Sequence, residues 1–172
     1  MKISRAEQAA LVKTKVLMYF RFERGLHLCC TEHHNADVVA SDGEYWNEVE
    51  VKVNWSDFLD DWKKRKHEYY MSRDLGSYHN IPNRFFFAAP PELAERIAAY
   101  LKERKISYGV IAVSDGECHP FQAPDHCRQI KMAVQIHKEA LHPNAIRSMV
   151  QRMSFEIITM RQRQHANGGS NG

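Results

Sequence analysis

Two acidic residues and a lysine stand close together in the first third of the chain. Asp37 lies in an apolar stretch, and Glu50-Val51-Lys52 begins thirteen residues later. Two carboxylates can hold one divalent cation, because Mg²⁺ prefers hard oxygen ligands at about 2.1 Å. A lysine beside them can stabilise the charge that develops on a phosphate during hydrolysis. These residue types in this order therefore favour phosphodiester chemistry.

The two acids fall on segments that a tight turn can pair. Residues 36–40 are apolar apart from Asp37, and residues 45–53 alternate between apolar and polar positions, as strands do. Asp42-Gly43 stands between them, and an Asp-Gly pair between apolar runs is a strong signal for a two-residue hairpin turn. The sequence therefore predicts an antiparallel hairpin.

The register of this hairpin decides which side chains can meet. If Ser41 faces Glu44, counting back places Asp37 opposite Glu48, and Asp37 and Glu50 become diagonal neighbours with backbones about 7–8 Å apart. Four side chains then project to one side of the sheet: Asp37, Glu48, Glu50 and Lys52. The same pattern is also typical of an ordinary sheet with one solvated face, so the order of the other elements has to decide.

Length and composition indicate one domain. A chain of 172 residues can build a substantial core, and 44% hydrophobic and 26% charged residues are ordinary for a globular protein. We assign residues 1–165 to this domain and expect residues 166–172, rich in Gly, Asn and Ser, to form a flexible tail. With no membrane-length apolar run, no signal-peptide pattern and no disulfide framework among four cysteines, we expect a cytoplasmic protein without a membrane partner.

Periodicity and turn signals predict helices and strands in alternation, which is typical of an α/β fold. Ser4 with Glu7 forms a capping-box pattern at the first helix, and Gly25 ends that helix. The expected elements are a helix over 4–24, strands over 26–30, 36–40 and 45–53, a helix from Ser56 or Asp57 to Ser72, a loop over 74–83, a strand over 84–89, a helix over 92–105, strands over 107–114 and 129–134, and a helix over 143–161.

This order and the Asp37…Glu50-Val51-Lys52 signature resemble the PD-(D/E)XK, or restriction-endonuclease-like, nuclease superfamily, and most of all its MmcB-type DNA-repair branch. The matching segments within residues 5–114 are 36–40, 49–52, Asp57-Phe58, Lys63 to Tyr69, 84–88 and 109–113. Ala36 stands where the superfamily pattern has proline. The resemblance implies a mixed central sheet flanked by helices, with an α-β-β-β-α-β-α-β core and a C-terminal helix.

The same resemblance implies a metal-dependent deoxyribonuclease in DNA repair, recombination or phage-related DNA processing. Asp37 and Glu50 would hold Mg²⁺ or Mn²⁺, with the Val51 carbonyl as a further ligand. Lys52 would orient the attacking water or stabilise the phosphate. DNA is the expected partner ahead of RNA. A homodimer is compatible with this assignment, because many such nucleases pair two active sites.

Five further residues are candidates for supporting the site or contacting nucleic acid: Glu7, Glu48, Lys63, Lys66 and His67. On the second predicted helix, Lys63 and His67 are four residues apart, as are Lys66 and Tyr70, so each pair shares a helix face. Simpler roles compete with these assignments: a solvated basic face for this helix, a rim charge for Glu48 and the capping box for Glu7.

Other functions stay open at this point. The chain could be a catalytically silent module that binds nucleic acid on the same fold, or a nuclease that acts on RNA. It could also be a structural or interaction subunit, in which Asp37, Glu50 and Lys52 form only a salt-bridge cluster. Because both acids and the lysine are present, the sequence favours a catalytic role over a structural or interaction subunit.

Overall fold

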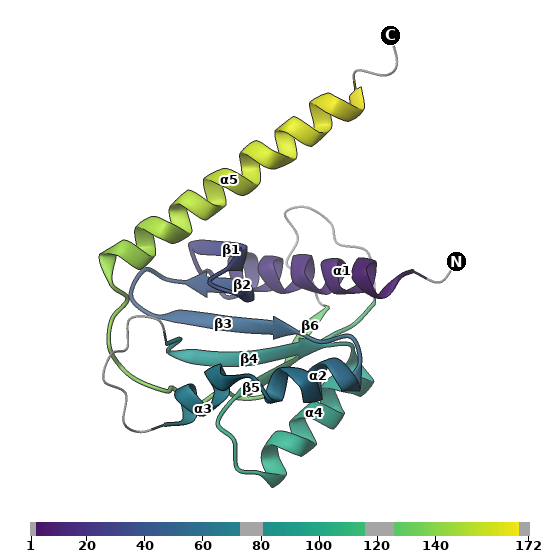
Figure 1. The fold of residues 1–172 in the computed structure, drawn as a ribbon, viewed down its shortest axis with the longest axis vertical. Helices are drawn as coiled ribbons and strands as arrows, with labels where there is room; N and C mark the ends of the chain where they lie inside the picture. Colours follow the sequence, from purple (N-terminus) through teal and green to yellow (C-terminus); the bar gives the residue numbers. More distant parts are fainter. Residues whose placement is uncertain (1–2, 73–80, 116–125, 169–172) are drawn as a thin grey trace.

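A six-stranded mixed sheet forms the centre of the fold (Figure 1). The computed structural model describes residues 3–72, 81–115 and 126–168. The strands are β1 (Leu28–His33), β2 (Ala36–Ser41), β3 (Trp46–Val51), β4 (Arg84–Ala89), β5 (Gly109–Val113) and β6 (Cys127–Lys131), and they lie side by side in this order. The β3–β4 and β4–β5 pairs are parallel. The β1–β2, β2–β3 and β5–β6 pairs are antiparallel.

Helices cover both faces of this sheet (Figure 1). They are α1 (Arg5–Met18), its π-helical continuation η1 (Tyr19–Glu23), α2 (Trp55–Trp62), α3 (Arg65–Met71), α4 (Pro91–Glu103) and α5 (Pro143–Gly168). α1 and η1 pack on one face, and α2 and α4 pack on the other. The predicted α/β fold, with a mixed central sheet flanked by helices, is therefore confirmed. Within the described residues, no helix is both long and apolar enough to cross a membrane.

The apolar run of β4 explains why the sheet is buried on both sides. Phe86 and Ala88 belong to the core under α1, whereas Phe85 and Phe87 belong to the core under α2 and α4. Successive side chains of a strand point to opposite faces, so a strand covered on both faces needs apolar residues at every position. β4 is such a strand. β3 beside it is also buried throughout, but it carries the polar residues Asn47, Glu48 and Glu50.

The start of α1 is as predicted. The Ser4 hydroxyl accepts the Glu7 N–H at 3.2 Å, and the Glu7 carboxylate accepts the Ser4 N–H at 2.7 Å. Both halves of the capping box are therefore formed. The helical segment ends before Gly25, whose φ of 69° is the left-handed conformation that glycine adopts without strain.

The hairpin between β2 and β3 has a wider turn than the predicted two-residue turn. Ser41 pairs with Trp46 instead of Glu44. The Asp42 carboxylate accepts the Glu44 and Tyr45 N–H groups, each at 2.8 Å, and so holds four residues in the turn. This two-residue shift keeps the paired side chains of β2 and β3 on their predicted faces, because strand side chains alternate with period two. Asp37 lies beyond the last pair of this ladder, and its carboxylate contacts α1 instead of joining Glu48 and Glu50.

The single helix predicted from Ser56 or Asp57 to Ser72 is wrong. Asn54 caps α2 by accepting the Asp57 N–H at 2.9 Å. The helical conformation is interrupted at Lys64, whose ψ of 136° is extended. Asp61 and His67 are both buried and bonded to each other. Six residues apart, they would point to different sides of one continuous helix, and the break brings them together.

Two strands also have bounds that differ from the prediction. β1 begins at Leu28 and continues to His33, because His34 and Asn35 adopt positive φ angles and form the turn. β6 begins at Cys127 and ends at Lys131, ahead of the predicted 129–134. The predicted loop over 74–83 lies mostly outside the described residues, which resume at residue 81.

α5 is longer than the predicted 143–161 and continues to Gly168. The expected tail 166–172 therefore begins inside the helix, and residues 169–172 lie outside the described residues. Helix-favouring Arg, Gln and Ala carry the helix to the Asn-Gly pair that can end it. The first part of α5 packs on β1, and the rest runs on beyond the sheet (Figure 1). Its exposed apolar side chains are Val150, Phe155, Ile157, Ile158 and Met160.

Gly109 offers a test of the packing between β4 and β5. A Cβ at this position would lie 2.6 Å from Cε1 of Phe86 and 2.9 Å from Cβ of Ala133. We expect Gly109→Ala to lower the free energy of unfolding in urea by about 1–3 kcal/mol, as overpacking does. The double variant with Phe86→Leu should lose less than the sum of the two single variants, because the shorter side chain removes the overlap. Strictly additive losses would contradict this explanation.

Candidate functional site

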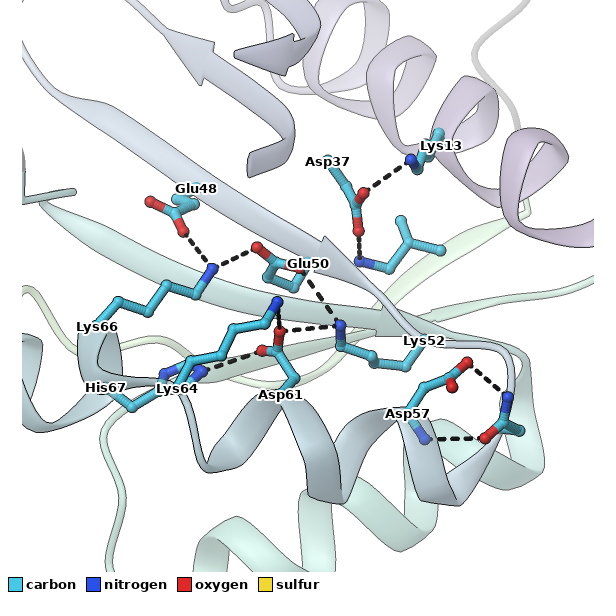
Figure 2. Close-up of polar contacts among 12 residues, drawn as sticks. Lys13, Asp37, Glu48, Glu50, Lys52, Asp57, Asp61, Lys64, Lys66 and His67 are labelled. Atoms are coloured by element: carbon cyan, nitrogen blue, oxygen red, sulfur yellow. Dashed lines mark hydrogen bonds and ion pairs between the residues drawn. The ribbon is translucent and has the colours of Figure 1, made fainter. Parts of the chain in front are cut away.

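A cluster of buried charges lies where α2 and α3 cover β3 (Figure 2). Strand alternation sends Val49 and Val51 into the core under α1, and Glu48 and Glu50 to the opposite face. The two glutamates are only 2% and 3% exposed, and Lys52, which follows the strand, is 7% exposed. Charges buried this deeply require partners, and α2 and α3 supply them.

Lys66 of α3 lies between the two glutamates. Its ammonium contacts Oε1 of Glu48 at 3.0 Å and also Oε1 of Glu50. One helical turn later, the Tyr70 hydroxyl donates to Oε2 of Glu48 at 2.9 Å. Lys66 and Tyr70 therefore share a face, as their spacing predicts. The Lys66 side chain is 20% exposed, so it separates the glutamates from solvent.

Lys52 connects this pair to a second acid. Its ammonium lies 3.3 Å from Oε2 of Glu50 and 3.3 Å from Oδ1 of Asp61. Asp61 also pairs with Lys64 and contacts Nε2 of His67 at 3.0 Å. Lys52, Asp61 and His67 therefore link the end of β3 to both α2 and α3.

Asp61 is the member of the cluster that the sequence reasoning missed. It is 2% exposed and contacts Lys52, Lys64 and His67. A signal was present, because Asp61 follows Phe58 by three residues on the buried side of α2. An acid within an apolar helical stripe requires a buried partner, and this is the pattern that finds it.

The pKa shifts agree with a network that holds its charges. Burial raises the pKa of Glu48, against the opposing effects of Lys66 and Tyr70. Burial works to lower the pKa of Lys66, but the charges of Glu48 and Glu50 outweigh it and raise that pKa. The pKa of Asp61 falls well below its usual range despite burial, because His67, Lys64 and Lys52 favour its carboxylate. Lys66 and Asp61 therefore remain charged at neutral pH.

Asp37 lies apart from this cluster, at the α1 side of the strand end. Its Oδ2 accepts the Val51 N–H at 2.7 Å, and its Oδ1 pairs with Lys13 of α1 at 2.7 Å. The ladder between β2 and β3 ends at the Val38–Val49 pair, so Asp37 and Glu50 are not paired within it. Figure 2 shows their carboxylates held by different lysines.

The structure brings some of the predicted residues together and separates others. Glu48, Glu50, Lys52, Lys66 and His67 belong to one network. Glu7 caps α1, and Lys63 pairs with Asp60 with a side chain that is 75% exposed, so neither of them contacts this network. Lys63 and His67 do not share a helix face, because the break at Lys64 separates them.

The donor set determines whether a divalent metal fits here. Among the residues that the structure describes, no three His, Cys, Asp or Glu side chains form a ready cation site. The Asp37 and Glu50 carboxylates and the Val51 carbonyl are nevertheless hard oxygen donors, which suit Mg²⁺ or Mn²⁺. The chemical nature of these donors therefore suits such an ion. Glu50 already pairs with the ammonium groups of Lys52 and Lys66, which compensate its charge and repel a divalent cation. Binding the ion would require Lys66 to move away from the Glu50 carboxylate.

Comparisons with known proteins bear on the fold. No known protein family matches the sequence, and no curated protein matches it either. A solved structure described as SPO1766, a protein of unknown function from Silicibacter pomeroyi, has a similar fold with a TM-score of 0.56. The similarity covers 100% of this chain and 98% of that chain at 16% sequence identity. This likeness extends over the whole chain and concerns the fold alone.

Replacing Lys66 tests whether the buried charges depend on it. We expect Lys66→Ala to lower the free energy of unfolding by about 3 kcal/mol, because two buried carboxylates lose their shared cation. The matched control is Lys63→Ala, which removes an exposed lysine and should cost about 0–1 kcal/mol. Urea unfolding at pH 7 measures both values. Equal losses in the two variants would show that the bridge contributes no more than a surface pair.

His33, at the end of β1, provides a test by pH. Burial, with His34 and Arg152 nearby, lowers the pKa of His33 to about 4. Between pH 6.5 and 4 the unfolded chain binds a proton that the folded chain does not, so stability falls as the pH falls. We expect His33→Asn to reduce this fall by about 2 kcal/mol. The exposed His34→Asn should retain most of the fall, because burial is the largest cause of the shift. The free energy of unfolding of the wild type and both variants is measured at pH 7 and at pH 4.5. An equal fall in this free energy for His33→Asn and His34→Asn would contradict the assignment.

Proposed function

We propose that the chain is a metal-dependent nuclease of the restriction-endonuclease-like superfamily that hydrolyses DNA phosphodiester bonds. One observation carries the proposal: Asp37, Glu50 and Lys52 gather at the same end of β3. Asp37 accepts the Val51 N–H, and Lys52 lies 3.3 Å from Glu50. Two acids that can hold a cation, beside a lysine that can stabilise a phosphate, suit metal-dependent phosphodiester hydrolysis. DNA repair, recombination or phage-related DNA processing is the proposed role.

Each side chain has a defined part in this proposal. Asp37 and Glu50, with the Val51 carbonyl, would hold Mg²⁺ or Mn²⁺. When bound, such an ion polarises the scissile phosphate and lowers the pKa of a water ligand. Lys52, held between Glu50 and Asp61, would keep its ammonium in place to stabilise the phosphate. Lys66 would move from Glu50 to a phosphate of the bound strand, since part of its side chain already reaches solvent.

The surface beside the cluster supports a polyanionic substrate. The α2–α3 junction presents Lys63, Lys64 and Arg65 to solvent, next to Lys66. Lysine and arginine side chains grouped in this way contact backbone phosphates and release counterions. The overall charge of +3 is compatible with such binding. The proposal includes a cytoplasmic location, and it allows two copies of the chain to act together on a duplex.

A second candidate is a catalytically silent module that binds nucleic acid. One specific observation favours it: Glu50 contacts Lys52 and Lys66, and Asp37 contacts Lys13 and the Val51 N–H. If these lysines remain in place, both acids serve folding and neither is free for a metal ligand. The basic α2–α3 junction would still bind phosphates.

Cleavage assays with Mg²⁺ or Mn²⁺ test the proposal on linear duplex, single-stranded and branched DNA and on RNA. We expect metal-dependent cleavage of DNA, with at least a 100-fold loss in Glu50→Gln and in Lys52→Ala, the magnitude typical of a lost transition-state contact. Lys102→Ala, which removes an exposed lysine of α4 away from this junction, is the matched control and should retain cleavage. Circular dichroism and urea unfolding establish that each variant is folded.

The other outcomes separate the alternatives. Cleavage of RNA alone would make the chain a ribonuclease. Absence of cleavage, with DNA binding equal in wild type and variants, would identify the silent binding module. Absence of both cleavage and binding would leave a structural or interaction subunit, in which the charged cluster stabilises the fold.

A further inference from the structure

A cavity lies on the opposite face of the sheet from the charged cluster. It occupies about 300 Å³ on the α1 side, near the starts of β3 and β4. Tyr19, Phe20, Asn47 and Phe86 are buried and form its floor, and Arg24 and Arg84 stand in its walls. A half-open cavity of this volume with an aromatic floor and a few polar groups is typical of a small-molecule site.

Arg84 is the side chain that points to a ligand. It is the first residue of β4 and lies on the same face as Phe86, above the cavity. Arg84 is half-buried, and within the described residues its guanidinium has neither a hydrogen bond nor an ion pair. A guanidinium presents five donors and stays charged, so withdrawing it from water without a partner is costly. An anion in the cavity would supply that partner.

A second arginine stands across the same cavity. Arg24 follows η1, is exposed, and lies near the Tyr19 hydroxyl. Neither arginine pairs with an acid in the described residues. Two guanidinium groups facing one space match the geometry of a phosphate, because each can donate two parallel hydrogen bonds to its oxygens.

The floor of the cavity has a fixed aromatic shape. The rings of Phe20 and Phe86 meet edge to face at 5.9 Å, and those of Tyr19 and Phe20 meet at 5.2 Å. Gly109 leaves room for the Phe86 ring, since any Cβ there would overlap it. Rings arranged edge to face present both ring faces and ring edges, and a planar ring can contact either in offset or edge geometry.

We infer that this cavity binds a phosphorylated small molecule of mononucleotide size. Arg84 and Arg24 take the phosphate, and the Phe20–Phe86 floor takes the planar base. A volume of about 300 Å³ holds one nucleotide and no longer strand. The inference does not rest on the proposed nuclease activity, because it uses the opposite face of the sheet and none of the residues of the charged cluster.

Calorimetric titration tests the assignment on the full chain, without a divalent metal. The probes are the four ribonucleoside 5′-monophosphates, adenosine and inorganic phosphate. We expect at least one monophosphate to bind more tightly than either adenosine or phosphate. Arg84→Gln should weaken that binding at least tenfold, whereas Arg163→Gln, which removes an exposed arginine of α5, should leave it unchanged.

Further variants keep the test decisive if Arg84→Gln folds poorly. Arg24→Gln changes an exposed residue and should also weaken binding of the monophosphate. Gly109→Ala should weaken it as well, by pushing the Phe86 ring into the cavity. Absence of binding by all four monophosphates at millimolar concentration would overturn the inference. Equal binding in wild type, Arg84→Gln and Arg24→Gln, or equal affinity for phosphate and monophosphates, would overturn it as well.

Discussion

The buried carboxylates of Glu48 and Glu50 beneath α3 need a cation, and the site and much of the fold depend on this requirement. Glu48 and Glu50 occupy a strand face that is otherwise apolar, and Lys66 supplies a cation to both. Without that cation, desolvation would favour protonation or exposure of the acids. The break at Lys64 follows from this requirement, because it lets Lys66 reach the glutamates while His67 reaches Asp61. A local irregularity of the backbone thus serves the electrostatics of the interior.

Alternation along β3 and β4 divides the molecule into two chemical environments. On one face, β3 presents Glu48 and Glu50 to α3, and on the other face Asn47 contributes to the floor of the nucleotide-sized cavity. β4 repeats this division with Phe85 inside one core and Arg84 above the cavity. Two polar sites can coexist on a single sheet because strand side chains alternate, so that each site uses its own set of positions.

The sequence was sufficient where a local rule determines the outcome. The capping box of Ser4 and Glu7, the doubly buried run of β4 and the shared face of Glu48 and Glu50 all follow from spacing. It was insufficient where a tertiary contact decides. The wider turn depends on the bonds of Asp42, and the break at Lys64 depends on a pair formed inside the fold. Lys13 lies on another element, so no local pattern near Asp37 could identify it as the partner.

The part of α5 that runs beyond the sheet has a consequence for how copies of the chain behave in water. It exposes Ile157, Ile158 and Met160, and the same stretch carries Arg161 and Arg163. At low ionic strength the arginines of two molecules repel each other across several ångströms of solvent, and added salt screens that repulsion while the apolar attraction persists. We therefore expect association of copies through this part of α5 to increase as the concentration of salt increases.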